Sequence, residues 1–593
     1  MSIVMAKDIK NFYFLRVQEL ETKISDLGEK LKTLALARLF VFIIFLSLAI
    51  VLIFLHHYLL LLATIMFLLV FLWLVRKHRK QGQLLATKEN LLLINQNELQ
   101  VLEGAESAFN DNFLLKKSHS LSRDLDLIGV NSLFNFIYRG VFNEGKIAFA
   151  DDLTESNYDS EQLISTQNAH KELAENIKFR QNFLAYSLKH PSTDLHTKSA
   201  ISNLKQSALP SKNINKRIIQ IIALINCSLI GYFGILGQWG LVGLFALIPW
   251  AVTGFLGKYL VIWQKNLSKT TLSFATLKTL LNLVKKESFN SPYLNSLQER
   301  SIKHLDLISS IKKLSNSFDR KLNGAAYLFN NTLFFSDVLL TLKCQEIESR
   351  IEEVTPENFG NLGEWEKLNS MANFKFNNPS YSTPEFSESL SISTENMGHP
   401  LIQQEIMVSN DFSSKIAPQT YLITGSNMSG KSTFLRALGI NQVLALMGGV
   451  VCASKFSTPI IPVLSHLRVD DSLNQQTSYF KAELDRLKSI LDNLKSGPAL
   501  VLIDEMLRGT NSDDKMMGSQ KYIERISKIP SLTFVATHDL SLGNLTLSHE
   551  NINNICFESE IREDNLFFDY LLKPGIAKNK NATWLMQKMD IIP

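Results

Sequence analysis

The chain has 593 residues, of which 46% are apolar and 20% are charged, and its formal net charge is +5. A chain of this length holds several domains of about 100–200 residues each. This composition excludes a wholly disordered protein, and the small net charge gives only weak support for a polyanionic partner. The scattered cysteines form no C-x-x-C pair, so we expect buried thiols in a reducing compartment and no structural metal. They are Cys227, Cys344, Cys452 and Cys556.

Residues 1–35 are predicted to form a charged amphipathic helix. Apolar residues recur there at alternating spacings of three and four, which is a heptad pattern. The seam consists of Val17, Leu20, Ile24, Leu27, Leu31 and Leu34. Two interpretations remain open at this point: a short coiled coil between two chains, or packing against another part of the same chain.

Residues 36–80 are predicted to form a transmembrane hairpin. The 37 residues between Arg38 and Arg76 include no Asp, Glu, Lys or Arg. A spanning helix needs about 20 apolar residues, with ~17 as the lower limit, so two short spans fit, near 39–55 and 59–75. Basic residues flank both ends, which places both ends in the cytoplasm by the positive-inside rule. The basic cluster at 76–80 also fits a nucleic-acid patch, but its place beside a span disfavours that alternative.

Residues 211–264 are predicted to form a second transmembrane hairpin. The 40 residues between Arg217 and Lys258 are free of charge, and a glycine-rich break divides them into spans near 218–236 and 241–262. A buried pair of soluble helices is the alternative. Residues 81–210 and 265–383 are expected to be helical and soluble. Prolines and a Ser/Thr-rich run then mark a boundary before a carboxyl-terminal domain at 384–593.

A phosphate-binding loop is predicted at 424–433, where the pattern G-x-x-x-x-G-K-[ST] lies between an apolar run and a helical one. Such a loop aims backbone N–H groups at phosphate oxygens, and the following helix adds its positive end. Lys431 is expected to reach the β- and γ-phosphates of ATP, and the Ser432 hydroxyl to bind Mg²⁺. The nucleotide-binding residues are Gly425, Ser426, Asn427, Met428, Ser429, Gly430, Lys431, Ser432 and Thr433.

Further candidate residues follow downstream of this loop. The apolar run 500–503 ends in Asp504 and Glu505, which predicts a Mg²⁺ ligand acting through water and a general base for the attacking water. A second run, 533–537, ends at His538, which is placed to sense the γ-phosphate. Ser478 is expected to cap a helix whose N-terminus approaches a phosphate bound by another subunit.

Several segments in order resemble the MutS family. The loop 424–433 is similar to the family's T-G-P-N-M-x-G-K-S-T. The segments at Ser478-x-Phe480-x-x-Glu483, Asp504-Glu505-x-x-Arg508-Gly509-Thr510 and Ala536-Thr537-His538 resemble its signature, its Walker B with D-loop, and its switch. Fainter likenesses fall on the domain's entry and exit and on the helical core, at 384–386, 398–401, 568–575, 126–137 and 167–184.

The chain also departs from the family pattern. Ser426 stands where the family has proline, and Ser429 where it has glycine or alanine; the loop should tolerate both. No counterpart of the mismatch-reading domain is recognised, and a membrane hairpin occupies that end. The second hairpin lies about where lever helices would run out to a DNA clamp, so we expect bilayer spans in place of the clamp tip.

The expected fold is therefore an α/β P-loop (ABC-type) ATPase domain at the carboxyl terminus, preceded by an all-α core and lever region and two transmembrane hairpins. The resemblance implies an ATP-hydrolysing homodimer, in which Ser478 of one subunit completes the other's site. It favours DNA binding of a mismatch-repair or damage-sensing type, whereas the missing DNA-contacting regions argue against mismatch recognition. An ATP-switched membrane scaffold without DNA binding is the alternative, and a transporter is disfavoured. The expected location is a bacterial-type inner membrane, with the ATPase domain and both termini cytoplasmic.

Overall fold

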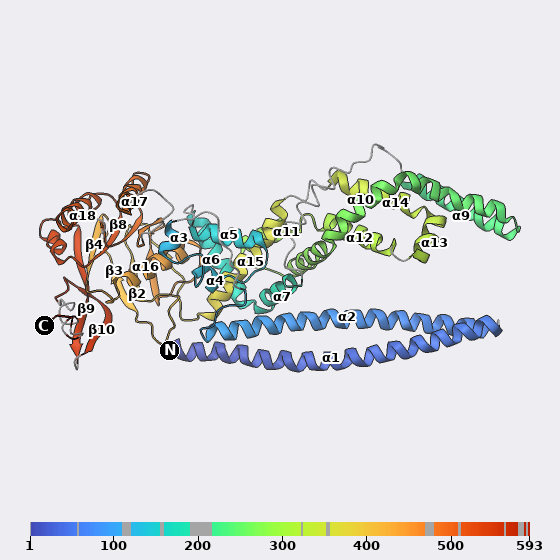
Figure 1. The fold of residues 1–593 in the computed structure, drawn as a ribbon, viewed down its shortest axis with the longest axis horizontal. Coiled ribbons are helices and arrows are strands. Elements are labelled where there is room, and N and C mark those ends of the chain that lie inside the picture. The colour runs from blue at the N-terminus through green and yellow to red at the C-terminus, as the bar shows by residue number, and fades with distance from the viewer. Residues whose placement is uncertain are drawn as a thin grey trace.

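The computed structural model describes most of the chain and shows an elongated molecule (Figure 1). An α/β region lies at one end, and long helices extend from a helical middle to the other end. The described residues are 2–55, 58–109, 120–154, 159–189, 216–321, 324–350, 356–468, 479–507, 511–562, 565–578, 586, 588, 591 and 592.

The first hairpin consists of α1 (Ser2–Leu55) and α2 (Tyr58–Leu102), which lie antiparallel along their length. Leu20 of the heptad seam is fully buried and the other five seam residues are partly buried, while neighbours on the outer face are exposed. The seam therefore packs against α2 of the same chain. At 1.5 Å per residue, α1 is about 80 Å long, so only its distal part belongs to the apolar segment.

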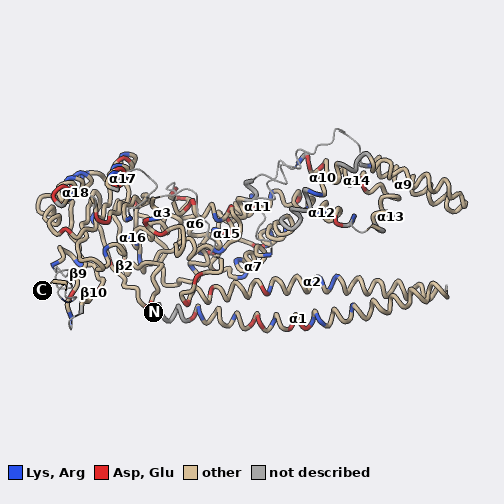
Figure 2. The backbone as a smooth tube through the Cα atoms, in the orientation of Figure 1, with Lys and Arg blue, Asp and Glu red and all other residues tan. Residues whose placement is uncertain are grey.

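The second hairpin consists of α9 (Lys216–Ile235) and α10 (Trp239–Lys286), joined by a tight turn in which Gly237 has φ +68°. Three helices of the described chain are long and apolar enough to cross a membrane, within Asp8–Leu55, Tyr58–Leu102 and Arg217–Ile235. A fourth candidate is made of two parts of α10, Trp239–Gly254 and Tyr259–Lys265, which are bent by 64° relative to each other. Figure 2 shows that the distal parts of both hairpins carry almost no charged residues.

Short helices build the middle of the molecule around one hydrophobic cluster. The proximal part of α10 enters this cluster with Trp263, Leu280 and Val284, which are fully buried beside Trp365. The helices are α3 (Ser120–Asp124), α4 (Leu133–Ile137), α5 (Asn143–Thr154), α6 (Ser160–Glu175), α7 (Ile177–Ser187), α11 (Pro292–Ile302), α12 (Leu305–Lys321), α13 (Gly324–Phe334), α14 (Ser336–Arg350) and α15 (Pro356–Asn377). Because α10 belongs both to this core and to the apolar hairpin, it connects the two.

The α/β region is built on a six-stranded sheet with the order β10-β9-β4-β8-β7-β6, parallel except for β10. Its central strands are buried on both faces, as expected for a parallel sheet covered by helices. The strands are β4 (Gln419–Thr424), β6 (Val463–His466), β7 (Leu500–Asp504), β8 (Leu532–Thr537), β9 (Ile552–Arg562) and β10 (Asn565–Pro574). The covering helices are α16 (Lys431–Leu446), α17 (Tyr479–Asn493), α18 (Ser512–Ile526) and the 3₁₀ helix η2 (Leu540–Leu547).

A second sheet with the order β1-β5-β2-β3 lies at the entrance to this region. Its strands are β1 (Glu385–Phe386), β2 (Ser393–Met397), β3 (Asn410–Ser413) and β5 (Lys455–Thr458). The hydrophobic core does not stop at this entrance, since Leu125 and Phe149 of the middle belong to the same cluster as Leu438 and Phe534. Gly439 in α16 allows the contact, because a Cβ there would come within 2.8 Å of the Leu125 side chain. The helical middle and the α/β region are thus joined by buried contacts.

Candidate nucleotide site

The loop between β4 and α16, where the sequence predicts phosphate binding, turns through several residues with positive φ. Gly425 and Gly430 have φ values of +157° and +112°, and Met428 also has a positive φ of +67°. A Cβ at Gly425 would lie 2.7 Å from both the Phe557 carbonyl oxygen and the Ser429 hydroxyl. Glycine is therefore required at 425 by space, and the loop turns directly into the N-terminus of α16.

Lys431 lies inside this loop. Its ammonium donates hydrogen bonds to the carbonyl oxygens of Gly425 and Ser426, both at 2.8 Å. Burial lowers the pKa of Lys431, while the nearby carboxylates of Glu505 and Asp504 act in the opposite direction. The cation is therefore held in the concave side of the loop, where phosphate oxygens could replace the two carbonyl oxygens as its acceptors.

Ser432 and Asp504 come together from two different elements. The Ser432 hydroxyl, in the first turn of α16, donates a 2.5 Å hydrogen bond to the Asp504 carboxylate at the end of β7. A hydroxyl and a carboxylate are oxygen ligands of the kind that Mg²⁺ prefers. These two residues fit the magnesium site that the sequence predicts.

Glu505 and His538 follow two neighbouring strands at the same edge of the sheet. The backbone N–H of Glu505 bonds to the Ala536 carbonyl at 3.0 Å, and Glu505 has φ +52°. Its carboxylate lies 3.2 Å from His538 Nδ1, and the His538 side chain is half exposed. Because β7 and β8 are parallel neighbours, the acidic pair and the histidine lie on one side of the loop.

The remaining loop residues divide by exposure. Asn427, Met428 and Thr433 are exposed, whereas Ser429 is buried, and its hydroxyl has no hydrogen-bond partner among the described residues. The Ser426 hydroxyl lies 3.2 Å from that of Ser559 on β9. Of the two serines that depart from the family pattern, Ser426 thus has a hydroxyl partner and Ser429 has none among the described residues.

Ser478 and residues 508–510 lie outside the described residues, so their predicted roles have no structural counterpart here. The helix that Ser478 was expected to cap begins at Tyr479 as α17. The predicted ATP residues that are described come together at one edge of the sheet, from the loop, β7 and β8.

Glu483 on α17 has a structural role that the sequence does not reveal. Its fully buried carboxylate accepts a 2.6 Å hydrogen bond from the backbone N–H of Leu507 and lies 3.4 Å from His466 Nε2. Leu507 has φ +57°, like Glu505 before it. The side chain of Glu483 thereby connects α17 to the turn that carries Asp504 and Glu505. In the sequence, the only sign of this role is the position of Glu483 in the segment that begins at Ser478.

Comparisons with known proteins match the region of the chain that carries this site. Residues 421–590 match the sequence profile of MutS domain V. MutS protein homolog 4 of Mus musculus is 31% identical over 211 residues, which are 34% of this chain and 22% of the relative. The Homo sapiens homolog 4 is 29% identical over 223 residues, 36% and 24% of the two chains. DNA mismatch repair protein MutS of Macrococcus caseolyticus (strain JCSC5402) is 30% identical over 205 residues, 34% and 24%. The similarity thus spans less than a quarter of each relative.

Proposed function

Because this chain belongs to the MutS family through its domain V, we propose that it binds and hydrolyses ATP as a dimeric switch anchored in a membrane. The observation that carries the proposal is the meeting of Lys431, Ser432, Asp504, Glu505 and His538 at one edge of the sheet. Fold alone does not fix function, whereas this set of side chains has a specific chemistry.

Each of these residues has a distinct role in the proposed reaction. Lys431 exchanges its carbonyl acceptors for the β- and γ-phosphates, and Ser432 and Asp504 hold Mg²⁺. The metal, when bound, neutralises charge on the transferred phosphoryl group. Glu505 accepts the proton of the attacking water, and His538, at 3.2 Å, orients that carboxylate and contacts the γ-phosphate.

A homodimer is part of this proposal. The N-terminus of α17 carries the segment that resembles the family signature, and a helix N-terminus attracts phosphate. We propose that Ser478 at this end completes the nucleotide site of a second copy. Closure of the dimer on ATP and reopening after hydrolysis would then move the helical arms.

A buried route leads from the loop to the helical middle. Helix α16 begins at Lys431 and ends near Gly448, whose carbonyl oxygen lies 2.7 Å from Nδ1 of the buried His170 on α6. A Cβ at Gly448 would also approach Thr166 of α6 at 3.1 Å. A shift of α16 would therefore displace α6, which Gly448 contacts directly.

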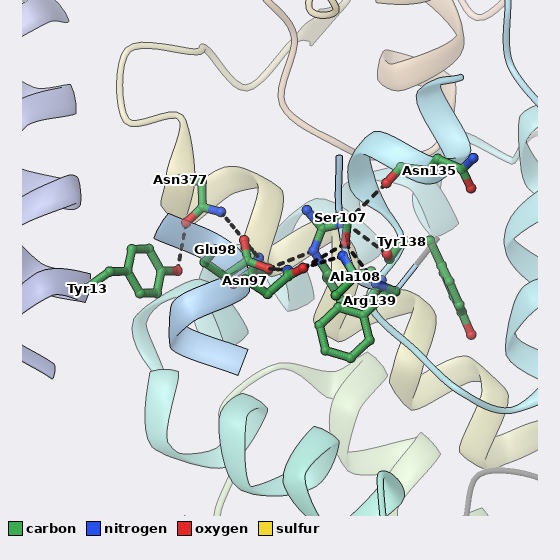
Figure 3. A network of polar contacts seen from close by, with 12 residues as sticks. Tyr13, Asn97, Glu98, Ser107, Ala108, Asn135, Tyr138, Arg139 and Asn377 are labelled. Carbon is green, nitrogen blue, oxygen red and sulfur yellow. Dashed lines mark hydrogen bonds and ion pairs between the residues drawn. The ribbon is translucent and has the colours of Figure 1, made fainter. Parts of the chain in front are cut away.

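The base of the first hairpin is fastened to the same core by a polar network (Figure 3). Glu98 of α2 accepts hydrogen bonds from Arg139 at 2.6 Å and from Asn377 of α15 at 2.7 Å. Asn377 in turn accepts one from Tyr13 of α1 at 2.8 Å. Since α15 leads into the α/β region, the hairpin and that region meet at one rigid junction.

The free ends of both hairpins support the membrane part of the proposal. Figure 1 places these ends at the end of the molecule away from the α/β region, and both are uncharged. We propose a bacterial-type inner membrane with the ATPase domain and both termini in the cytoplasm. A duplex clamp would need basic residues at these tips. DNA remains the second candidate partner because one relative is a DNA mismatch repair protein, and a membrane scaffold without DNA is the alternative.

Detergent-solubilised protein tests both the enzymatic and the DNA part. Glu505→Gln should retain ATP binding and lose turnover by about 100-fold or more, since the general base is removed. Glu560→Gln, which changes an exposed carboxylate on β9, is the matched control and should keep turnover. Full hydrolysis by Glu505→Gln would overturn the proposed base. Absence of duplex binding at low salt, where phosphate contacts are strongest, would select the scaffold alternative.

A further inference from the structure

Beside the second hairpin lies another uncharged segment, within the range 265–383 that was expected to be helical and soluble. Residues 322–336, fifteen in a row, include no Asp, Glu, Lys or Arg and lie between Lys321 and Asp337. Their helix, α13, has 11 residues. At 1.5 Å per residue it is about 16 Å long, which is too short to cross a bilayer.

Helix α13 lies beside the apolar hairpin and turns polar atoms toward it. The Asn331 amide donates to the Thr253 hydroxyl of α10 at 2.9 Å, and Trp250 donates to the Thr332 hydroxyl at 3.0 Å. Asn226 of α9 donates to the Thr332 carbonyl at 3.4 Å. Three polar side chains within the apolar stretches of α9 and α10, those of Asn226, Trp250 and Thr253, therefore have partners on α13.

The outward face of α13 carries three large apolar side chains and one exposed polar residue, Asn330. Leu328 and Phe329 are 57% and 61% exposed and Phe334 is 46% exposed, and the two phenylalanine rings lie 6.5 Å apart. A helix on the surface of a soluble protein shows the reverse pattern, with polar residues outward. Apart from Asn330, the polar side chains that contact the hairpin lie inward and the large apolar side chains lie outward, which is the arrangement expected of a helix in lipid.

The two ends of the uncharged segment are held together. Lys321 and Asp337 form an ion pair at 2.6 Å, and the Tyr327 hydroxyl donates to Asp337 at 2.7 Å. The Lys321 ammonium also lies 4.8 Å from the centre of the Tyr327 ring. The chain therefore enters and leaves the uncharged segment at one point, as in a re-entrant loop, and a tyrosine lies there as in an interfacial belt.

The depth of α13 follows from its partners. Asn226 precedes the turn at Gly237 by 11 residues, and Trp250 follows it by 13. These positions are therefore about 16–20 Å from the tip of the hairpin, close to half the ~30 Å thickness of the hydrocarbon layer. If the turn at Gly237 lies at the far surface of the membrane, Thr332 lies about midway across the hydrocarbon layer. Lys321 and Asp337 then lie on the side that faces the helical middle.

We propose that residues 324–336 form a re-entrant membrane segment, in which Leu328, Phe329 and Phe334 contact the acyl chains of the nearer leaflet. The proposal rests on the membrane anchoring proposed above. The occupant is lipid because the outward face of α13 continues the exposed apolar surface of α9 and α10. The segment also supplies the hydrogen-bond partners that Asn226, Trp250 and Thr253 require in a layer without water.

Fluorescence quenching in vesicles tests this proposal. The full chain with Cys227→Ala, which leaves the three buried native cysteines, is given one new cysteine and an environment-sensitive label. The protein is reconstituted in phosphatidylethanolamine–phosphatidylglycerol vesicles that contain a nitroxide-labelled phosphatidylcholine. The positions are Phe329→Cys on α13, Leu224→Cys on the exposed face of α9 as the lipid reference, and the exposed Lys313→Cys on α12 as the water reference.

We expect the label at 329 to be quenched by the nitroxide lipid within about twofold of that at 224 and to resist aqueous iodide, unlike that at 313. Iodide quenching at 329 equal to that at 313, with 224 still lipid-quenched, would overturn the re-entrant segment and leave the anchoring intact. Iodide quenching at both 224 and 329 would overturn both proposals.

Discussion

Glu98 and Arg139 form an ion pair at 2.6 Å in the interior, with side chains only 2% and 5% exposed. Burial by itself would raise the pKa of Glu98, but Arg139 and the amides of Asn373 and Asn377 bring it below the ordinary value. The pair lies where the base of the first hairpin meets α15 (Figure 3). It therefore fastens the base of the proposed membrane anchor to the helical middle of the molecule.

Removal of one partner of this pair should destabilise the protein. Arg139→Met leaves a buried carboxylate without its cation, which typically costs about 3–5 kcal/mol. Denaturant unfolding in detergent, followed by a probe in the α/β region, measures the loss. Arg16→Met removes an exposed pair with Glu19 and should change stability by less than about 1 kcal/mol. Equal effects of the two variants would contradict the structural role of the buried pair.

The space around Gly425 predicts that an added methyl group abolishes nucleotide binding. Gly425→Ala brings a Cβ to 2.7 Å from the Phe557 carbonyl, so we expect ATP affinity to fall at least tenfold. Gly497 is a matched control, since its φ of +159° is nearly the same and nothing lies within 4 Å of an added Cβ. Gly497→Ala should retain the affinity for ATP in a fluorescent-nucleotide titration. If Gly497→Ala loses as much affinity as Gly425→Ala, the steric explanation for the effect at Gly425 is wrong.

Glu483 is expected to position the turn that carries the general base. Glu483→Gln weakens the acceptor of the Leu507 N–H, and Glu483→Ala removes it. Steady-state ATPase assays should show kcat falling about tenfold or more for the alanine variant and less for glutamine, with little change in KM. Asp485→Asn changes an exposed carboxylate on the same helix and serves as control. A change confined to KM would exclude the positioning role.

His170 predicts a stability that falls on acidification. Its Nδ1 carries the proton donated to the Gly448 carbonyl, while Nε2 is buried without a hydrogen-bond partner among the described residues. Burial lowers the pKa of His170 to about 4. The unfolded chain, with a histidine pKa near 6.5, binds the proton more readily, so stability is complete above that pH and is lost between about 6.5 and 4.

The loss that His170 causes should reach about 2 kcal/mol at pH 5. His170→Asn keeps a donor near the Gly448 carbonyl without a titrating ring. Denaturant midpoints at pH 7.5 and pH 5 should therefore differ less in the variant than in the native protein. An unchanged pH dependence would assign the acid sensitivity to other groups.

The meeting of the candidate site residues at one edge of the sheet was predictable because its signals are local. The loop pattern requires glycines at two positions. Two apolar runs, which end at Asp504 and His538, predict buried parallel strands, and the carboxyl ends of such strands meet at the same edge of the sheet. The role of Glu483 was not predictable, because its partner Leu507 is 24 residues away and is engaged through a backbone N–H. The heptad seam is likewise compatible with packing against a second chain or against the same chain. In the structure it packs against the antiparallel helix α2 of the same chain.

The proposed membrane location of the uncharged segment at 322–336 could not be predicted from the length of that segment. Fifteen uncharged residues are too few for a span, and the alternation of apolar and polar residues fits a packing helix as well. The distinction depends on which side of the helix faces out. Asn331 and Thr332 face inward, where they contact Thr253 and Trp250 of α10. Likewise, the buried contact of Leu125 with α16, which joins the middle to the α/β region, carries no sequence signal beyond a leucine.

Co-flotation of Mg²⁺-dependent ATPase activity with lipid vesicles on a density gradient tests the membrane-anchored switch most directly. The account predicts that protein and activity float together and stay with the vesicles at alkaline pH. Glu505→Gln should float equally well without activity, and Glu560→Gln should float with activity. ATPase activity that remains at the bottom of the gradient, or full activity of floating Glu505→Gln, would contradict it.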